Sequence, residues 1–221
     1  MQRIPEPELM DEPAQARAYA EADFSEPNQL FADAVVEALG DHRAGTMIDL
    51  GCGPGDICLR LARALPRWRL TALDAGPNML ALAREALDRA SLSDRIELRQ
   101  ARLPRGRPEQ TFDAVISNSL LHHLPDPMTL WQSIAALAGP GAYVQVMDLQ
   151  RPDSVERARR IVDQHAADAP AILREDFYNS LLAAWTADEA GEQINAAGLA
   201  GLRVSRPSER HWMASGFVGR D

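Results

Sequence analysis

The stretch MIDLGCGPG, residues 47–55, decides the fold of this chain. A short apolar run ends there in glycines at alternate positions, Gly51, Gly53 and Gly55. The residues that follow, 56–65, have the apolar spacing of a helix. A strand, a glycine loop and a helix in this order predict a ligand site, because the N-terminus of the helix offers N–H groups without partners.

Strands and helices alternate on both sides of this loop. We expect short strands at 46–50, 70–73, 96–98, 112–117 and 142–147, with helices at 14–39 (broken near 25–27), 56–65, 77–90 and 127–137. This alternation predicts right-handed crossovers and an α/β, doubly wound, mostly parallel sheet. Beyond residue 153 we expect helices at 154–167, 175–184 and 188–197, then an antiparallel pair made of LRVSRP and HWMASGFV.

Length and composition favour one globular domain. The chain has 221 residues, with 46% hydrophobic and 25% charged. We expect a single domain over 1–221, made of a helical N-terminal cap (1–45), a ligand-binding core (46–150), a helical insertion (151–187) and a C-terminal helix with the final strand pair (188–221). No apolar run is long enough to span a bilayer and the N-terminus does not resemble a secretion signal, so we expect a cytoplasmic protein without a membrane partner.

Charge and cysteine content narrow the possible functions. All 23 basic residues are arginine, which excludes a lysine nucleophile, and the net charge of −9 disfavours nucleic acid as a partner. An arginine-rich face is still available at Arg95, Arg99, Arg102, Arg105 and Arg107. Cys52 and Cys58 have no histidine at ligand spacing, so we expect reduced thiols and no metal site.

The glycine spacing differs from that of a dinucleotide loop. Here the pattern is G-x-G-x-G with Asp49 in front and no basic residue inside, which suits a cationic ligand better than a pyrophosphate. The next strand ends in LTALD, where Asp74 is placed to accept the hydroxyls of a ribose. Together these residues predict an adenosine-type ligand without a pyrophosphate.

Three motifs, in order, resemble the class I S-adenosylmethionine-dependent methyltransferases. They are DLGCGPG (49–55), LTALDAGPNML (70–80) and FDAVISNSLLHHLPDP (112–127), within a match that runs from about residue 46 to 147. The resemblance implies a seven-stranded Rossmann-like sheet with an antiparallel last strand. It also implies S-adenosyl-L-methionine as methyl donor and S-adenosyl-L-homocysteine as product.

The resemblance places donor contacts on individual residues. Asp49 would orient the loop or the amino end of the donor, the glycines would let the chain pass close to it, and Asp74 would hold the ribose. Ala75 and Met79 would lie beside the adenine, and Gln100 stands where many members carry an acid for the adenine amino group. The full expected set is Asp49, Gly51, Cys52, Gly53, Gly55, Asp74, Ala75, Met79, Gln100, Ala101 and Asn118.

Catalytic and acceptor-binding residues are less specified by the sequence. Methyl transfer from a sulfonium needs mainly alignment and exclusion of water, and a base only when the acceptor must lose a proton. Candidates for such a base are His123, His122 and Asp148, with only one histidine of the pair expected to face the site. Candidates for the acceptor pocket are Tyr19, Phe24, Tyr178, Trp185 and His211. The alternative for every one of these residues is ordinary packing.

The expected activity is methyl transfer to a small molecule, because the cap and the insertion are large enough to cover one. Three alternatives stay open at this point. The first is an RNA or protein methyltransferase that uses the arginine-rich face. The second is a donor-binding subunit without catalysis, and the third is a nicotinamide dehydrogenase, which the glycine spacing disfavours. The sequence does not indicate the oligomeric state.

Overall fold

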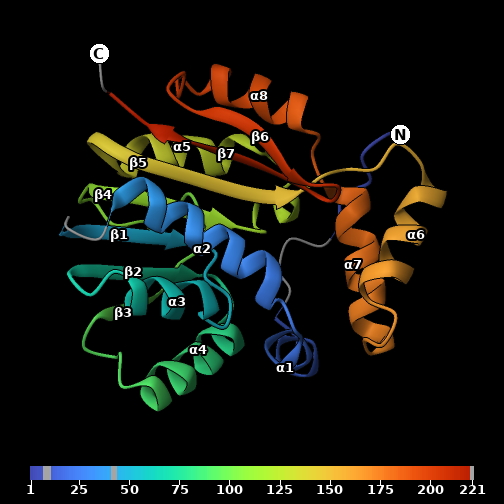
Figure 1. Cartoon of the computed structure of the whole chain (residues 1–221), viewed down its shortest axis with the longest axis horizontal. Coiled ribbons are helices and arrows are strands. Elements are labelled where there is room, and N and C mark those ends of the chain that lie inside the picture. The colour runs from blue at the N-terminus through green and yellow to red at the C-terminus, as the bar shows by residue number, and fades with distance from the viewer. Residues whose placement is uncertain (7–10, 41–43, 220–221) are drawn as a thin grey trace.

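The fold was determined from a computed structural model that describes residues 1–6, 11–40 and 44–219. A seven-stranded sheet with the order β3-β2-β1-β4-β5-β7-β6 forms its centre (Figure 1). Its strands are β1 Gly45–Leu50, β2 Trp68–Asp74, β3 Ile96–Gln100, β4 Phe112–Asn118, β5 Ala138–Leu149, β6 Arg203–Ser208 and β7 His211–Phe217. β7 runs antiparallel to both its neighbours and the other pairs are parallel. This confirms the expected sheet and its antiparallel last strand.

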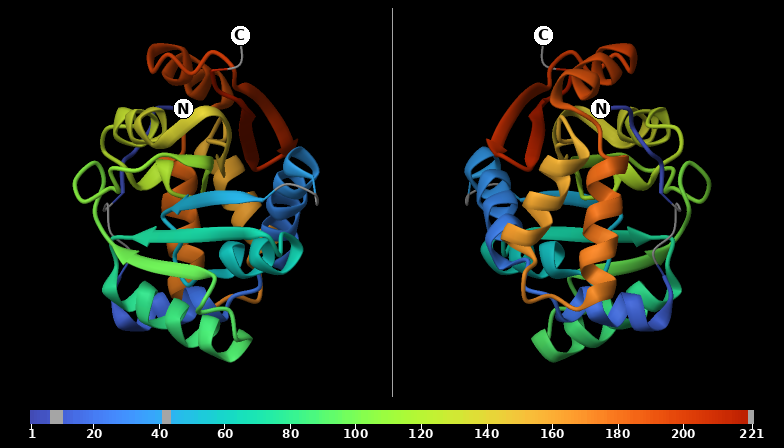
Figure 2. Two further views of the ribbon diagram at one scale, coloured as in Figure 1. Left: turned by 90° about the vertical axis from the view of Figure 1, so that its left-hand side faces the viewer. Right: turned by 90° about the vertical axis from the view of Figure 1, so that its right-hand side faces the viewer.

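Helices cover both faces of the sheet and one end of it. They are α1 Pro13–Glu21, α2 Ser25–Leu39, α3 Asp56–Ala64, α4 Pro77–Ala90, the short 3-10 helix η1 Leu121–His123, α5 Met128–Leu137, α6 Val155–His165, α7 Ala171–Ala183 and α8 Ala187–Ala196. Figure 2 shows α2 and α5 on opposite sides of the strands. Figure 1 shows α1, α6 and α7 gathered at the end toward which the arrow of β5 points.

The hydrophobic core is divided by the sheet into two layers. One layer joins α2, α3 and α4 to the sheet, with Phe31, Leu61 and Leu87 among its buried side chains. The other joins α5 and α8 to the opposite face, around Trp131 and Ile194. A separate cluster holds α6 against α7. The end of the molecule that carries α6 and α7 therefore has packing of its own.

Local signals explain where several helices begin. Pro77 opens α4 at a position where its missing N–H costs nothing. Thr186 and Glu189 form a reciprocal capping box at α8: the Thr186 hydroxyl accepts from the Glu189 N–H at 3.2 Å, and the Glu189 carboxylate accepts from the Thr186 N–H at 2.8 Å. These contacts use N–H groups that the helix itself leaves unpaired.

Three expected boundaries were wrong, one of them the start of α7, which lies at Ala171 instead of residue 175. The break between the N-terminal helices lies before Ser25, and Pro27 falls inside the first turn of α2, where proline is tolerated because no N–H is needed. β5 begins at Ala138 instead of Ala142, since an irregular stretch still pairs Phe112 with Ala138. In the described part of the chain, no helix is long and apolar enough to cross a membrane.

Candidate functional site

A cavity of about 1100 Å³ lies at the carboxyl ends of the central strands. One part of its wall comes from the glycine loop and the ends of β2 and β4. The other part comes from α1, the start of α2, the η1 turn, and α6 and α7. The expected donor residues in the wall are Asp49, Gly51, Cys52, Gly53, Asp74, Ala75, Met79, Ala101 and Asn118.

The three loop glycines all have left-handed backbone conformations, with φ of 78° at Gly51, 52° at Gly53 and 85° at Gly55. What a side chain would meet differs among them. A Cβ atom would lie 3.0 Å from Leu120 at Gly51 and 3.3 Å from the Cβ of Ala83 at Gly55, but nothing lies within 4 Å at Gly53. Neighbouring side chains therefore crowd Gly51 and Gly55, and of the three glycines only Gly53 presents bare backbone to open space.

Asp74 at the end of β2 is fixed by backbone N–H groups. One carboxylate oxygen accepts from Gly53 and the other from Gly76, both at 2.8 Å. Burial raises the pKa of Asp74, while these hydrogen bonds act in the opposite direction. Each oxygen has a second lone pair, so the carboxylate can still accept two hydroxyl groups from a ligand.

Polar acceptors from two neighbouring strands lie beside the loop. Asp49 is 2% exposed, and its carboxylate is 3.2 Å from the thiol of Cys58. Burial raises the pKa of Asp49 to about 7. Asn118 donates weakly to Asn28 at 3.4 Å, and its buried amide oxygen has no partner. A carboxylate and an amide oxygen without a partner make this part of the cavity suited to a cationic group of the methyl donor.

The η1 turn carries both histidines to the cavity, which contradicts the expectation that only one faces it. The rings of His122 and His123 lie 4.1 Å apart, and both line the wall. Asp148 lies behind them and is not in the wall: it pairs with His122 Nδ1 and accepts the N–H of Leu121 at 2.7 Å. Burial is the largest influence on the pKa of His122 and lowers it, but the charge and hydrogen bond of Asp148 together with the charge of Glu6 raise the pKa overall.

The expected acceptor residues divide into two groups. Tyr19, Phe24 and His211 line the cavity, and the rings of Tyr19 and Phe24 lie 4.7 Å apart. Burial raises the pKa of Tyr19 to about 12 and lowers that of His211 to about 4, so both are neutral near pH 7. Tyr178 packs with the α6–α7 cluster, and Trp185 lies under the guanidinium of Arg3 at 4.3 Å, both outside the wall.

Gly55 and Gln100 also lie outside the cavity wall. The Gln100 side chain is exposed and its amide donates to the carbonyl of Ala75 at 3.4 Å. The role of Gln100 as a substitute for the adenine-binding acid therefore stays a prediction.

Sequence reasoning missed two carboxylates near the histidines. Glu6 Oε1 lies 3.1 Å from His123 Nδ1 and 3.6 Å from His122 Nε2. Asp176 in α7 accepts from Gln15 in α1 at 2.9 Å, and its second oxygen is buried without a partner. Both residues are distant from the histidine pair in sequence, so no spacing rule could have found them.

Known proteins resemble this chain in sequence and in fold. Residues 48–144 match the profile of a family described as a methyltransferase domain. A trans-aconitate 2-methyltransferase from Mycobacterium tuberculosis (strain ATCC 25177 / H37Ra) is 32% identical over 148 residues, which are 67% of this chain and 50% of the relative. A release factor glutamine methyltransferase from Rhodopirellula baltica is 31% identical over 132 residues, 57% of this chain and 45% of the relative.

Among solved structures, a plantazolicin methyltransferase in complex with S-adenosylhomocysteine superposes with a TM-score of 0.74 at 13% identity. The match covers 95% of this chain and 91% of that one. At 13% identity, this structural similarity shows a shared fold and not a shared substrate. The chain spans about half the length of the curated relatives it matches. The matched domain, the glycine loop and the strand order agree with one another, and the chain carries a methyltransferase domain with the class I S-adenosylmethionine-dependent fold.

Proposed function

We propose that this protein transfers a methyl group from S-adenosyl-L-methionine to a small molecule. The observation that carries the proposal is one cavity of about 1100 Å³ that is lined both by the glycine loop and by the cap helices. Ligand sites are usually about 300–1,000 Å³. The cavity is therefore large enough for a donor and a small acceptor side by side.

The proposed donor pose follows from the polar groups of the loop. The ribose hydroxyls bind the remaining lone pairs of Asp74, and the chain of the donor passes over the bare backbone at Gly53. The ammonium of the methionine part lies near Asp49 and the orphan oxygen of Asn118. Each contact pairs the ammonium or a hydroxyl of S-adenosylmethionine with a protein oxygen that is buried or partly buried.

The proposed chemistry is an in-line displacement. The bond between the sulfonium sulfur and the methyl carbon breaks while the acceptor forms its bond to that carbon, and the sulfonium becomes a neutral thioether. The protein contributes alignment and a cavity wall that limits water. Where the acceptor must lose a proton, His122 or His123 in the wall is the candidate to receive it.

The charges of the cavity bear on the acceptor. Among described residues, guanidinium groups in the wall come from Arg60, Arg102 and Arg210, while carboxylates come from Glu21, Asp23, Glu26, Asp49, Asp56, Asp74, Asp168 and Asp176. Arg60 is 2.6 Å from Asp56 and Arg210 is 3.7 Å from Glu26. This balance favours a neutral or cationic acceptor over a polyanion.

A labelling experiment tests the proposal. The protein is incubated with methyl-labelled donor and a fractionated cell extract, and the label is followed into small-molecule and macromolecular fractions. We expect it among the small molecules. Label confined to protein or RNA would refute the small-molecule acceptor, and absence of donor binding by calorimetry would refute the activity itself.

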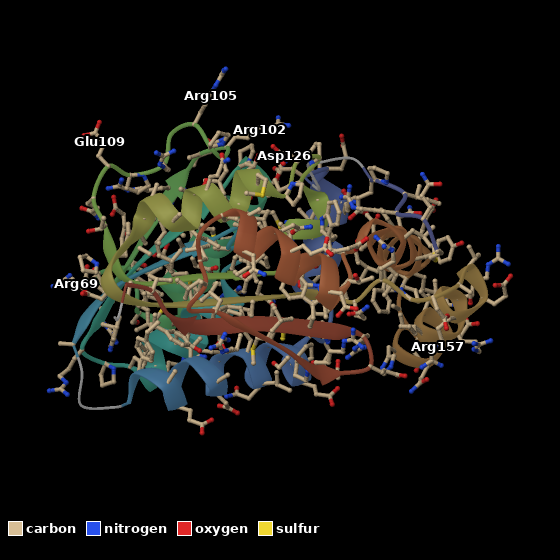
Figure 3. All side chains as sticks on the ribbon, turned by 90° about the horizontal axis from the view of Figure 1, so that it is seen from above. Arg69, Arg102, Arg105, Glu109, Asp126 and Arg157 are labelled. Atoms are coloured by element: carbon tan, nitrogen blue, oxygen red, sulfur yellow. The ribbon has the colours of Figure 1, made fainter. Side chains whose placement is uncertain are left out.

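A protein acceptor is the second candidate, because one relative is by name a release factor glutamine methyltransferase. RNA is less well supported. The guanidinium of Arg95 donates hydrogen bonds to the carbonyls of Ala62, Leu65 and Trp68. Arg95 is therefore not part of an RNA-binding face. Figure 3 shows Arg105 pointing outward, with Glu109 and Asp126 projecting from the same side. An RNA enzyme would show tight, salt-sensitive RNA binding.

A further inference from the structure

We propose that Glu6, His122 and His123 form a binding site for a divalent d-block cation, with Zn²⁺ as the probe ion. The three residues come from the N-terminal segment and the η1 turn, and one ligand atom from each lies within 4.8 Å of the others. Metal binding itself does not depend on methyl transfer.

The distances fit a shared ion. Glu6 Oε1 is 3.1 Å from His123 Nδ1 and 3.6 Å from His122 Nε2. Ligand atoms about 2.0–2.2 Å from a tetrahedral ion are about 3.3–3.6 Å apart. Both observed distances are within a few tenths of an ångström of that range. The two histidine nitrogens lie within 4.8 Å of each other, so their side chains would close around the ion to complete the site.

The site is largely dry. The side chain of His122 is 3% exposed, that of Glu6 8% and that of His123 14%. His123 Nδ1 is buried and, despite the nearby Glu6 oxygen, has no partner in hydrogen-bonding geometry. A buried ring nitrogen without a hydrogen bond is costly unless something else binds it. A cation between this nitrogen and Glu6 removes that cost.

Outer contacts hold the ligands in place. Asp148 pairs with His122 Nδ1, which leaves His122 Nε2 directed toward Glu6. The hydroxyl of Ser180 lies 3.2 Å from both oxygens of Glu6 and donates to that carboxylate. A carboxylate behind a histidine and a hydroxyl behind a carboxylate are the outer contacts that metal ligands usually have.

The nearby arginine does not fill the site. Arg3 donates through Nη2 to the carbonyls of His122 and Leu124, at 2.9 and 3.3 Å, and lies over the ring of Trp185. It therefore fixes the backbone of the η1 turn. Its charge also discourages a cation, which makes the two buried carboxylates, Glu6 and Asp148, important for balance.

The ligand types select the class of ion. Two imidazoles and one carboxylate suit Zn²⁺, Fe²⁺ and related ions, whereas Mg²⁺ and Ca²⁺ prefer oxygen ligands. Three protein ligands leave one coordination position open. Because His122 and His123 both line the cavity, that position faces the space in which an acceptor would bind. This last point rests on the proposed function, and in the cation-bound form the histidine nitrogens that bind the ion no longer receive a proton from the acceptor.

The test is a metal titration of the full chain without donor. Protein stripped with a chelator is titrated with Zn²⁺ by calorimetry, and Co²⁺ absorption reports the coordination geometry. We expect one equivalent to bind and the melting temperature to rise with Zn²⁺. Glu6→Gln and His123→Gln should each lower the affinity at least about tenfold, by analogy with the loss of outer contacts.

The matched control is His165→Gln, because His165 also lies beside a carboxylate, 3.0 Å from Glu209, but without a second histidine in the cluster. It should bind Zn²⁺ like the unmodified chain. Circular dichroism checks that each variant folds, and His123→Gln replaces Glu6→Gln if the latter does not. Absence of stoichiometric Zn²⁺ binding, or equal affinity in both ligand variants and the unmodified chain, overturns the site while leaving donor binding unaffected.

Discussion

Asp74 binds Gly53 through a hydrogen bond of 2.8 Å between its carboxylate and the glycine N–H. The end of β2 thereby holds the middle of the glycine loop that follows β1. A second hydrogen bond of the same length joins the other Asp74 oxygen to Gly76. One carboxylate thus sets the loop geometry and, in the proposed function, also receives the ribose.

Asp74→Ala should weaken donor binding at least about tenfold, the scale of a lost charge-assisted contact of about 1.5–3 kcal/mol. Isothermal titration with S-adenosylmethionine measures it. Asp113→Ala is the control, because Asp113 accepts the Thr46 N–H at 2.8 Å at the opposite end of the sheet. Equal affinity in the two variants would contradict the ribose assignment.

Gly53→Val should abolish donor binding while the protein stays folded, because Gly53 faces open space where the donor is proposed to pass. Gly198→Val is the matched control: Gly198 also has a left-handed φ, of 74°, and nothing within 4 Å of an added Cβ. Each change should cost about 1–2 kcal/mol of unfolding free energy from backbone strain. Only the variant in the loop should lose binding, and normal binding by it would refute the close approach.

Donor affinity should rise with pH between 6 and 8. Burial raises the pKa of Asp49 to about 7, so the carboxyl is mostly protonated at pH 6 and mostly ionised at pH 8. The ammonium of the donor prefers the ionised form, and the affinity should fall about tenfold from pH 8 to pH 6. Calorimetry at three pH values measures this slope. The Asp49→Asn variant should bind the methyl donor weakly at pH 8, and its affinity should not change between pH 6 and pH 8. If its affinity still rose with pH, the pH dependence would belong to another group.

The capping box of α8 gives a stability prediction that is independent of ligands. Thr186→Ala removes the acceptor of the Glu189 N–H and should lower the unfolding free energy by about 1 kcal/mol. Urea unfolding followed by circular dichroism measures the change. Thr186→Ser keeps the hydroxyl and should stay close to the unmodified chain. A loss of the same size in both variants would place the effect in the methyl group.

The sheet and the donor side of the cavity could be predicted because their signals are local. A buried strand, a glycine loop and an acid at the end of the next strand are each visible in a few consecutive residues, and Asp49, Gly53 and Asp74 line the same cavity. Helix starts were less certain because Pro27 is compatible with either a break or a first turn.

The rest of the wall could not be predicted because it depends on contacts between distant segments. Glu6 reaches the histidines from the N-terminal segment, and η1 turns both rings to the same side, which no sequence spacing indicates. Trp185 is an aromatic residue of the kind that often lines a pocket, yet Arg3 covers its ring. Aromatic character alone does not distinguish a wall from a packing contact.

The separation between the sheet and the α6–α7 cluster has a consequence for how this family diversifies. The side chains that hold α6 against α7 belong to their own hydrophobic cluster, apart from the two layers that stabilise the sheet. Leu173 and Phe177, which line the cavity from α7, belong to neither sheet layer, so we expect substitutions there to leave the glycine loop and its supporting core unchanged. If the α6–α7 side of the cavity binds the acceptor, as proposed, acceptor preference can change without a change in methyl-donor binding, and exchange of this segment between relatives is a route to altered specificity.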